Sequence, residues 1–163
     1  MYKIIDDFLK KSDFLKIKES LLSNEFPWYY TKVLDRTPVS MEAKEYNFQF
    51  THTFYKDSKP ISNAVFLLDP IINRISPDNI LRIKANLNIK TEKIVEHGHH
   101  VDFNECTTAI FYVNSNNGKT IFQNGSVVES LENRLLVFNS NLMHSGTTCT
   151  DENVRCVINF NYI

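Results

Sequence analysis

The chain has 163 residues, of which 42% are hydrophobic and 23% are charged, and its formal net charge at pH 7 is -1. This balance is typical of a globular domain with a real core, and it excludes the strongly basic footprint of a nucleic-acid-binding protein. The longest apolar stretch, around residues 64–68, is too short to span a bilayer. We therefore expect one domain over residues 1–163, with no nucleic-acid or membrane partner, and composition leaves its oligomeric state open.

The cysteines and the N-terminus predict the compartment. Cys106, Cys149 and Cys156 are odd in number and form no CxxC motif, which favours free thiols in a reducing environment. No basic segment leads into an apolar run at the N-terminus, so the sequence has no sign of a signal peptide. We expect a cytoplasmic protein.

The first third of the chain predicts a helical segment. Residues 3–5 read as a short strand, and a helix follows that Ser12 and Asp13 can cap. Its apolar residues recur at helical spacing: Phe14, Ile17, Leu21 and Leu22. The aromatic segment 26–30 ends the helix and predicts core packing, with a wall of a substrate cleft as the alternative.

The remainder changes from mixed structure to many short strands. Residues 45–56 alternate as in a strand, and residues 61–75 read as a helix that Pro70 should kink or split. After a turn at 77–79, successive strands are predicted at 80–91, 107–114, 120–122, 126–129, 134–138, 143–148 and 154–162. Gly118 and Lys119 read as a turn.

Short strands with regular turns predict a mainly β fold, a barrel or two-sheet jelly roll, with flanking helices that cover one sheet from outside. Residues 1–79 would supply the helices and outer strands, and residues 80–163 the β core.

Alternation in two strands indicates a wet interior. Arg155, Val157, Asn159 and Asn161 share one face of the last strand, and the apolar Cys156, Ile158, Phe160 and Tyr162 share the other. In residues 81–88, Arg82, Lys84, Asn86 and Asn88 likewise oppose Ile83, Ala85 and Leu87. A polar inner face suits a charged pocket and is unusual in a dry core.

His100 and Asp102 form the most informative motif of the sequence. In an extended strand both side chains point the same way, which supplies two thirds of the 2-His-1-carboxylate facial triad of non-haem iron sites. His144 is the best candidate for the third ligand, and Arg155, eleven residues later, could hold a distal carboxylate. His97 and His99 are rival ligands, but neither shares a face with Asp102, so we interpret them as loop or supporting residues.

At these residues the sequence resembles the 2-oxoglutarate- and Fe(II)-dependent oxygenases, particularly the prolyl-4-hydroxylase-like branch and small single-domain members, including ones carried by bacteriophages. The resemblance covers roughly residues 80–163 and, less specifically, the N-terminal helices. The matching pieces are His100-Val101-Asp102, residues 110–114, the glycine at 118, residues 133–138, His144 and Arg155.

The resemblance implies a cupin-like double-stranded β-helix in which His100, Asp102 and His144 hold Fe(II). It implies that Arg155 pairs with the distal carboxylate of 2-oxoglutarate, with Tyr112 at the same carboxylate. Asn86 falls where prolyl hydroxylases often carry a pocket tyrosine, and we predict that it also faces the co-substrate.

The implied reaction is hydroxylation of a peptide or small molecule by dioxygen, with succinate and carbon dioxide as co-products and ascorbate as an accessory reductant. A peptidyl proline is the first candidate substrate by analogy. Loops at 30–44, 57–60 and 91–99 would set specificity.

Two features distinguish this chain from other branches. Nucleic-acid demethylases of the group carry a second arginine where this sequence has Asn161, and halogenating members lack the carboxylate that Asp102 supplies. Two other classes of function remain as alternatives: a non-catalytic jelly-roll binding module, and a metal-binding cupin with different chemistry.

Overall fold

The computed structural model of the protein describes residues 1–32, 34–36 and 38–163. The helices are α1 (Lys11–Leu21), α2 (Met41–Glu45), the 3-10 helix η1 (Asn63–Leu68) and α3 (Asp69–Ile75). The strands are β1 (Tyr2–Ile5), β2 (Tyr29–Thr31), β3 (Gln49–Lys56), β4 (Lys59–Pro60), β5 (Ile80–Ile89), β6 (Thr107–Tyr112), β7 (Asn116–Phe122), β8 (Val127–Ser130), β9 (Arg134–Asn139), β10 (His144–Gly146) and β11 (Val154–Tyr162).

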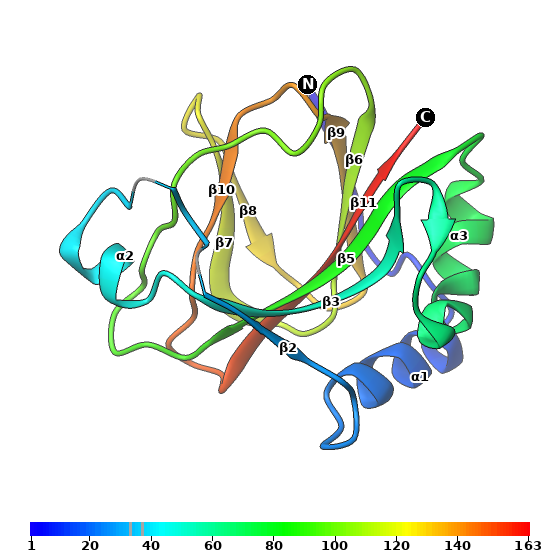
Figure 1. The fold of residues 1–163 in the computed structure, drawn as a ribbon, viewed down its shortest axis with the longest axis horizontal. Coiled ribbons are helices and arrows are strands. Elements are labelled where there is room, and N and C mark those ends of the chain that lie inside the picture. The colour runs from blue at the N-terminus through cyan, green and yellow to red at the C-terminus, as the bar shows by residue number, and fades with distance from the viewer. Residues whose placement is uncertain (33, 37) are drawn as a thin grey trace.

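Within the described residues the strands form two antiparallel sheets. The larger sheet has the order β1-β9-β6-β11-β5-β3-β2, with β4 paired to β3, and the smaller sheet has the order β10-β7-β8. The small sheet faces the inner side of the large one (Figure 1), and a pocket lies between the two sheets. This arrangement confirms the predicted jelly roll with flanking helices.

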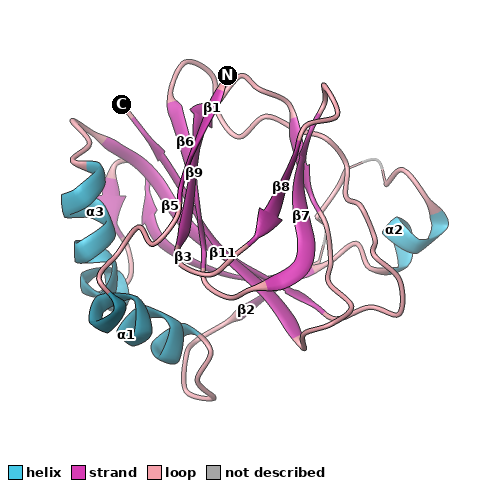
Figure 2. Cartoon of the chain, turned by 180° about the vertical axis from the view of Figure 1, so that it is seen from behind, coloured by secondary structure: helices cyan, strands magenta, loops and turns pink. Residues whose placement is uncertain are grey.

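The helices α1 and α3 cover the outer face of the large sheet (Figure 2). Phe14, Ile17 and Leu21 of α1 and Ile71 of α3 are buried with apolar side chains of the strands, which are Ile83, Ala85, Phe111, Cys156, Ile158 and Phe160. Such burial of apolar surface is the main stabilising contribution to the fold. The apolar face predicted for the last strand therefore packs against the helices and belongs to the core.

A second, smaller apolar cluster lies between the sheets. It contains Ile110, Tyr112, Phe122, Val128, Leu136, Phe138 and Val157. The pocket beside it is largely polar, because the inner face of β5 and the rest of β11 carries charged and amide side chains. The predicted alternation of both strands is confirmed by their register, in which Arg155 pairs with Asn88 and Asn161 with Arg82.

Several local predictions differ from the structure. Ser12 does not cap α1, which begins at Lys11 without a side-chain cap. The predicted helix 61–75 is split as expected, and Pro70 lies in the first turn of α3, where its missing N–H costs no helical hydrogen bond.

The aromatic segment does not act as core throughout. Tyr29 and Tyr30 are 62% and 61% exposed on the edge strand β2, while Trp28 packs against the core and donates to the Leu21 carbonyl. The prediction of core packing is therefore wrong for both tyrosines. An edge strand buries one face at most, and nothing in this aromatic run indicates which of its residues lie at the edge.

Asn133 ties the N-terminal segment to the large sheet. Its side chain accepts from the Leu9 N–H and donates to the Leu9 carbonyl, both at 2.9 Å, and its φ is 59°. β1 pairs with β9 immediately beside this contact. The first ten residues are thereby part of the β core rather than an appendage to it.

The remaining sequence expectations concern covalent and membrane features. All three cysteines are buried and none forms a disulfide. None of the helices in the described part of the chain has the length and hydrophobicity that a bilayer span requires.

Candidate metal centre and pocket

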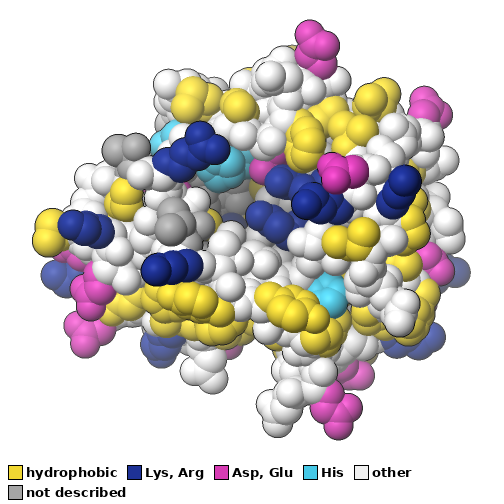
Figure 3. Space-filling view, in the orientation of Figure 1, with side chains coloured by type: hydrophobic (Ala, Val, Ile, Leu, Met, Phe, Trp, Pro, Cys, Tyr) yellow, Lys and Arg dark blue, Asp and Glu magenta, His cyan; other side chains and the backbone are white. Residues whose placement is uncertain are grey.

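A pocket of about 820 Å³ opens between the two sheets. Figure 3 shows the hollow on one face of the molecule, with lysine and arginine side chains gathered around it and histidine beside them. Its lining comes from β5, β7, β11, the segment 97–102 and the segment 143–146, together with residues 34–36 and Gln49. The expected specificity segment 57–60 is not part of this lining, and Val33 and Thr37 of the segment 30–44 lie outside the described residues.

His100 and His144 lie side by side at the pocket. Their backbones form an isolated antiparallel bridge, with N–H to carbonyl distances of 2.9 and 3.0 Å, and their ring centroids are 4.8 Å apart. The bridge explains how two histidines 44 positions apart come together, since it fixes one against the other through the main chain. β10, which carries His144, is held in turn by β7.

Both imidazoles are oriented for ligation by a hydrogen bond of the ring nitrogen Nδ1. His100 Nδ1 lies 3.1 Å from the Gly98 carbonyl, and His144 Nδ1 lies 3.0 Å from the Leu142 carbonyl. A carbonyl can only accept, so each Nδ1 carries the proton and each Nε2 keeps a lone pair. This is the arrangement that orients histidines at metal centres.

Asp102 supplies a carboxylate at the same place. Its Oδ1 accepts from Arg82 Nη2 at 2.8 Å, and its Oδ2 lies 3.4 Å from Asn161 Nδ2. Burial by itself would raise the pKa of Asp102, but Arg82 and the two imidazoles hold that pKa below its ordinary value. The carboxylate is therefore ionised at neutral pH.

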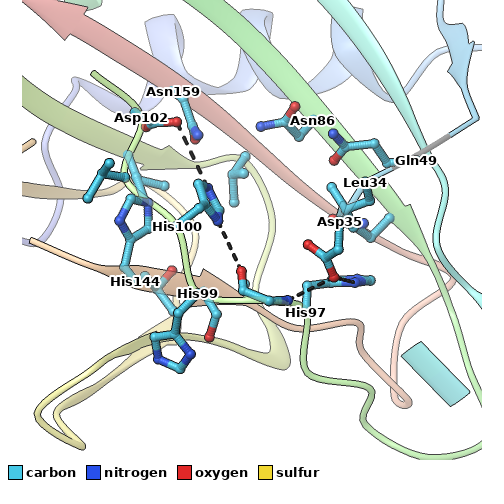
Figure 4. Close-up of a pocket in the computed structure, with 18 of the residues that line it drawn as sticks. Leu34, Asp35, Gln49, Asn86, His97, His99, His100, Asp102, His144 and Asn159 are labelled. Carbon is cyan, nitrogen blue, oxygen red and sulfur yellow. Dashed lines mark hydrogen bonds and ion pairs between the residues drawn. The ribbon is translucent and has the colours of Figure 1, made fainter. Parts of the chain in front are cut away.

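The three side chains form a candidate metal site, because ligand atoms of His100, Asp102 and His144 all lie within 4.8 Å of one another. Two imidazole nitrogens and one carboxylate oxygen are the donor set of non-haem Fe(II) sites, and Mn or Ni also suits such ligands. The free Nε2 atoms and the ionised carboxylate fit a divalent cation. Figure 4 shows the three side chains at one end of the pocket.

The backbone of this motif differs from the prediction. His100 lies in the isolated bridge and Asp102 in a bend, so the expected extended strand is wrong here. The two side chains still meet, with His100 Nε2 4.0 Å from Asp102 Oδ1. Arg82 and Asn161 position the carboxylate from neighbouring strands, and the bridge positions the imidazole.

Arg155 is a buried cation in the same pocket. It is 3% exposed, and its guanidinium donates to Ser130 Oγ at 3.0 Å and to Thr120 Oγ1 at 3.2 Å. No carboxylate pairs with it in the described part of the chain. Burial lowers the pKa of Arg155, yet a guanidinium stays protonated in proteins. A buried cation without an anion is unfavourable, so this arrangement indicates a site for an anionic group.

Gly118 makes room for that arginine. A Cβ at this position would lie 2.5 Å from Arg155 Cδ and 2.8 Å from the Thr148 carbonyl oxygen. Gly118 belongs to strand β7, so its interpretation as a turn is wrong. A glycine followed by lysine is common in turns, whereas the close approach of Arg155 depends on contacts 37 positions away.

Tyr112 and Asn86 hold different positions at the pocket. Tyr112 is fully buried beneath Arg155, with its ring centroid 5.9 Å from the guanidinium carbon, and its hydroxyl donates to Thr120 Oγ1 at 2.8 Å. It is not part of the pocket lining, whereas Asn86 is. Asn86 Oδ1 is buried without a hydrogen-bond partner among the described residues.

His97 is a pocket residue whose surroundings the sequence did not indicate. It is buried, Asp35 Oδ2 lies 3.5 Å from its Nδ1, and neither ring nitrogen has a hydrogen-bond partner in the described residues. Asp35 also accepts from the Gly98 N–H at 2.8 Å, so the segment 34–36 packs against the segment 97–99 (Figure 4). Burial lowers the pKa of His97 more than the nearby Asp35 raises it. His99, the second rival ligand, faces Glu96 instead.

Comparison with known proteins supports the fold. A prolyl hydroxylase from Trichoplax adhaerens, in complex with a hypoxia-inducible-factor peptide, is similar to 99% of this chain over 83% of its own length, with a TM-score of 0.68 and 15% identity. A prolyl-4-hydroxylase from Pseudomonas putida matches 99% of the chain over 91% of its own length, with a TM-score of 0.60 and 11% identity. HygX from Streptomyces hygroscopicus, with nickel and 2-oxoglutarate bound, matches 99% of the chain over 82% of its own length, with a TM-score of 0.61 and 11% identity.

The chain thus has the fold of the 2-oxoglutarate- and Fe(II)-dependent oxygenases, as its residues predicted. At the sequence level, neither the scan against family models nor the search of curated proteins finds a match. The candidate metal centre lies inside this jelly roll. The two prolyl hydroxylase structures are similar to nearly the whole chain.

Proposed function

We propose that the protein is a 2-oxoglutarate- and Fe(II)-dependent dioxygenase that hydroxylates an organic substrate. The observation that carries the proposal is that one pocket contains both the His100, Asp102 and His144 cluster and the buried, anion-free Arg155. A metal centre alone would not need a buried cation, and an anion site alone would not need two oriented imidazoles. A co-substrate that binds a metal at one end and a cation at the other accounts for both features.

His100, Asp102 and His144 would hold the ferrous ion. When bound, the ion would supply the chemistry by which dioxygen oxidises 2-oxoglutarate to succinate and carbon dioxide while a C–H bond of the substrate is hydroxylated. The protein's residues contribute binding, orientation and exclusion of water. Three protein ligands would leave coordination positions of the ion free for other ligands.

Arg155 would bind the distal carboxylate of 2-oxoglutarate. Two of its N–H groups are already held by Ser130 and Thr120, which fixes the guanidinium plane and leaves N–H donors for the ligand. Tyr112 supports this position through Thr120, and Asn86 offers its side-chain amide N–H from the neighbouring strand β5. We propose that both serve the co-substrate site, Tyr112 indirectly through Thr120 and Arg155, and Asn86 by direct contact from the side.

A peptidyl proline is a candidate substrate on analogy alone, since one structural neighbour is a prolyl hydroxylase with a peptide bound, and a free amino acid or small metabolite is the other candidate. Ascorbate would keep the iron reduced between cycles. The reaction itself is tested by succinate formation from 2-oxoglutarate in air, with anaerobic titrations of Fe(II) and 2-oxoglutarate as the binding measurements.

Titrations separate this proposal from its alternatives. The dioxygenase binds one metal ion and then 2-oxoglutarate, and loses the second event when Arg155 is replaced. A cupin with different chemistry binds metal but is indifferent to Arg155, and a non-catalytic jelly-roll module binds neither ligand. Metal-loaded protein that forms no succinate with any candidate substrate would contradict the proposal.

A further inference from the structure

The pocket has more cationic side chains than the binding of a metal ion and 2-oxoglutarate requires. Four cationic side chains line it, Arg36, Arg82, Lys84 and Arg155, against two carboxylates, Asp35 and Asp102. A divalent cation and a dianionic co-substrate cancel one another's formal charge. The loaded pocket would therefore still carry about two positive charges next to the reacting centre, which favours an anionic second ligand.

Two cations in this set have no assignment, Lys84 and Arg36, and of the two only Lys84 is half-buried. Arg82 is paired with Asp102, and Arg155 is the residue proposed to bind the distal carboxylate of 2-oxoglutarate. Lys84 is half-buried on the inner face of β5 and forms neither a hydrogen bond nor an ion pair with any described residue. Burial and the nearby Arg82 lower the pKa of Lys84, so an anion beside it would relieve an unfavourable position.

The position of Lys84 separates it from the co-substrate site. The guanidinium of Arg155 leans toward the small sheet, where it contacts Thr120 of β7 and Ser130 of β8. In the large sheet β6 and β5 flank β11 on opposite sides, and Lys84 pairs with Asn159 of β11 and with Thr53 of β3. A ligand at Lys84 would therefore lie on the β5 side of the pocket, away from the small sheet.

Buried polar atoms without partners also line the pocket: two of them belong to β5 and β11, and the others belong to His97, whose backbone N–H donates to the Gly146 carbonyl of β10. They are Asn86 Oδ1, Asn159 Oδ1 and both ring nitrogens of His97, in side chains that are all less than 9% exposed. Each unmade hydrogen bond at a buried atom is costly, so the group of them points to a polar ligand. Figure 4 shows Asn86, Asn159 and His97 around the same space, with Gln49 beside Asn86.

We propose that the primary substrate is a small molecule with a carboxylate or phosphate group, which Lys84 binds on the β5 side of the pocket. The inference rests on the proposed function, because it assigns the substrate of the same site. Asn159 and His97 bind the polar part of that substrate, and Arg36, which also lines the pocket, adds to the attraction. An uncharged prolyl ring would leave both the ammonium and these polar atoms unsatisfied.

The direct test is a titration of small anions followed by NMR. The protein is ¹⁵N-labelled, loaded with Zn(II) in place of iron and saturated with 2-oxoglutarate, and then titrated with inorganic phosphate or with acetate. We expect shifts at backbone amides of β5 and of residues 97–99, and a Kd at least tenfold higher in Lys84→Gln. Lys90→Gln is the matched control, because Lys90 is exposed and does not line the pocket.

The same samples distinguish an anionic substrate from a second contact to the co-substrate. If Lys84→Gln weakens 2-oxoglutarate binding as strongly as an Arg155 variant does, Lys84 belongs to the co-substrate site and the inference is wrong. Anion shifts that occur only in metal-loaded protein without 2-oxoglutarate, or that never occur, overturn it as well. Failure of the proposed function gives a different result, since the metal-loaded protein then binds no 2-oxoglutarate.

A second arm uses turnover. A metabolite extract is divided on an anion exchanger, and each fraction is tested for stimulation of succinate formation. We expect stimulation from the retained fraction with wild type and with Lys90→Gln, and its loss in Lys84→Gln at an unchanged Kd for 2-oxoglutarate. Stimulation confined to the unretained fraction or to proline-containing peptides would contradict an anionic substrate.

Discussion

Replacement of Arg155 by methionine is the sharpest test of the co-substrate site. Methionine keeps most of the length and apolar contact of the arginine stem but removes the guanidinium. A hydrogen bond to a charged group contributes about 1.5–3 kcal/mol, so the Kd for 2-oxoglutarate should rise between roughly 10-fold and 150-fold. The Kd for the metal should not change, because the hydrogen-bond partners of the guanidinium are Ser130 and Thr120, and neither belongs to the metal site.

The stability of the unliganded protein gives a second, independent measurement. Arg155 is a buried cation without an acidic partner in the described residues, so its removal should leave the apo protein as stable as before or more stable. At a ligand concentration of 100 Kd, wild type gains about 2.7 kcal/mol from binding. With a 100-fold higher Kd, the same concentration would contribute only about 0.4 kcal/mol.

The assay combines calorimetric titration of 2-oxoglutarate into Mn(II)-loaded protein with thermal unfolding in its presence and absence. Arg134→Met is the matched control, since Arg134 forms an ion pair with Asp6 at the surface and does not line the pocket. A Kd for Arg155→Met within about threefold of wild type would refute the assignment. So would a large loss of stability in the apo protein, which would mean that Arg155 serves the fold.

Three further predictions follow from single contacts. Gly118→Ala should weaken 2-oxoglutarate binding in calorimetry while metal binding persists, because the added Cβ would lie 2.5 Å from Arg155 Cδ; equal weakening of both would contradict this. Burial lowers the pKa of His97 below its value in the unfolded chain, so unfolding takes up a proton below about pH 6.5. The stability of the apo protein should therefore decrease as the pH is lowered through this range, by up to about 1.4 kcal/mol per pH unit. His97→Gln should reduce this pH dependence in urea titrations. Asn133→Ala should cost about 2–5 kcal/mol in the same assay, since it removes two buried hydrogen bonds to Leu9 at a left-handed φ; a loss below about 1 kcal/mol would refute this.

The part of the site that sequence could predict is the part set by strand alternation. The last strand was predicted with its observed limits, and its period of two placed Arg155 on the inner face and Cys156 in the core. The same period placed Lys84 and Asn86 in the pocket. Alternation is local, so it can be read without knowledge of which strands are neighbours.

The parts that sequence missed depend on contacts between distant segments. Asp35 and His97 are 62 positions apart, and no periodic pattern covers either segment, so their packing could not be predicted. The backbone of His100 was predicted as a strand, but it forms only a bridge to His144. The three residues predicted as metal ligands nevertheless lie close together. They could be selected by type, because two imidazoles and a carboxylate suit a divalent metal.

The two faces of the large sheet separate stability from ligand binding. The outer face packs Ile83, Phe111 and Ile158 against α1 and α3 and contains the main apolar cluster of the fold. The inner face presents charged and amide groups, several of which have no partner among the described residues, so their burial is unfavourable in the protein without ligand. Substitutions such as Lys84→Gln and Arg155→Met should therefore change binding without loss of folding. A protein that unfolded on either substitution would show that the polar face contributes to the fold, and the separation between core and pocket would fail with it.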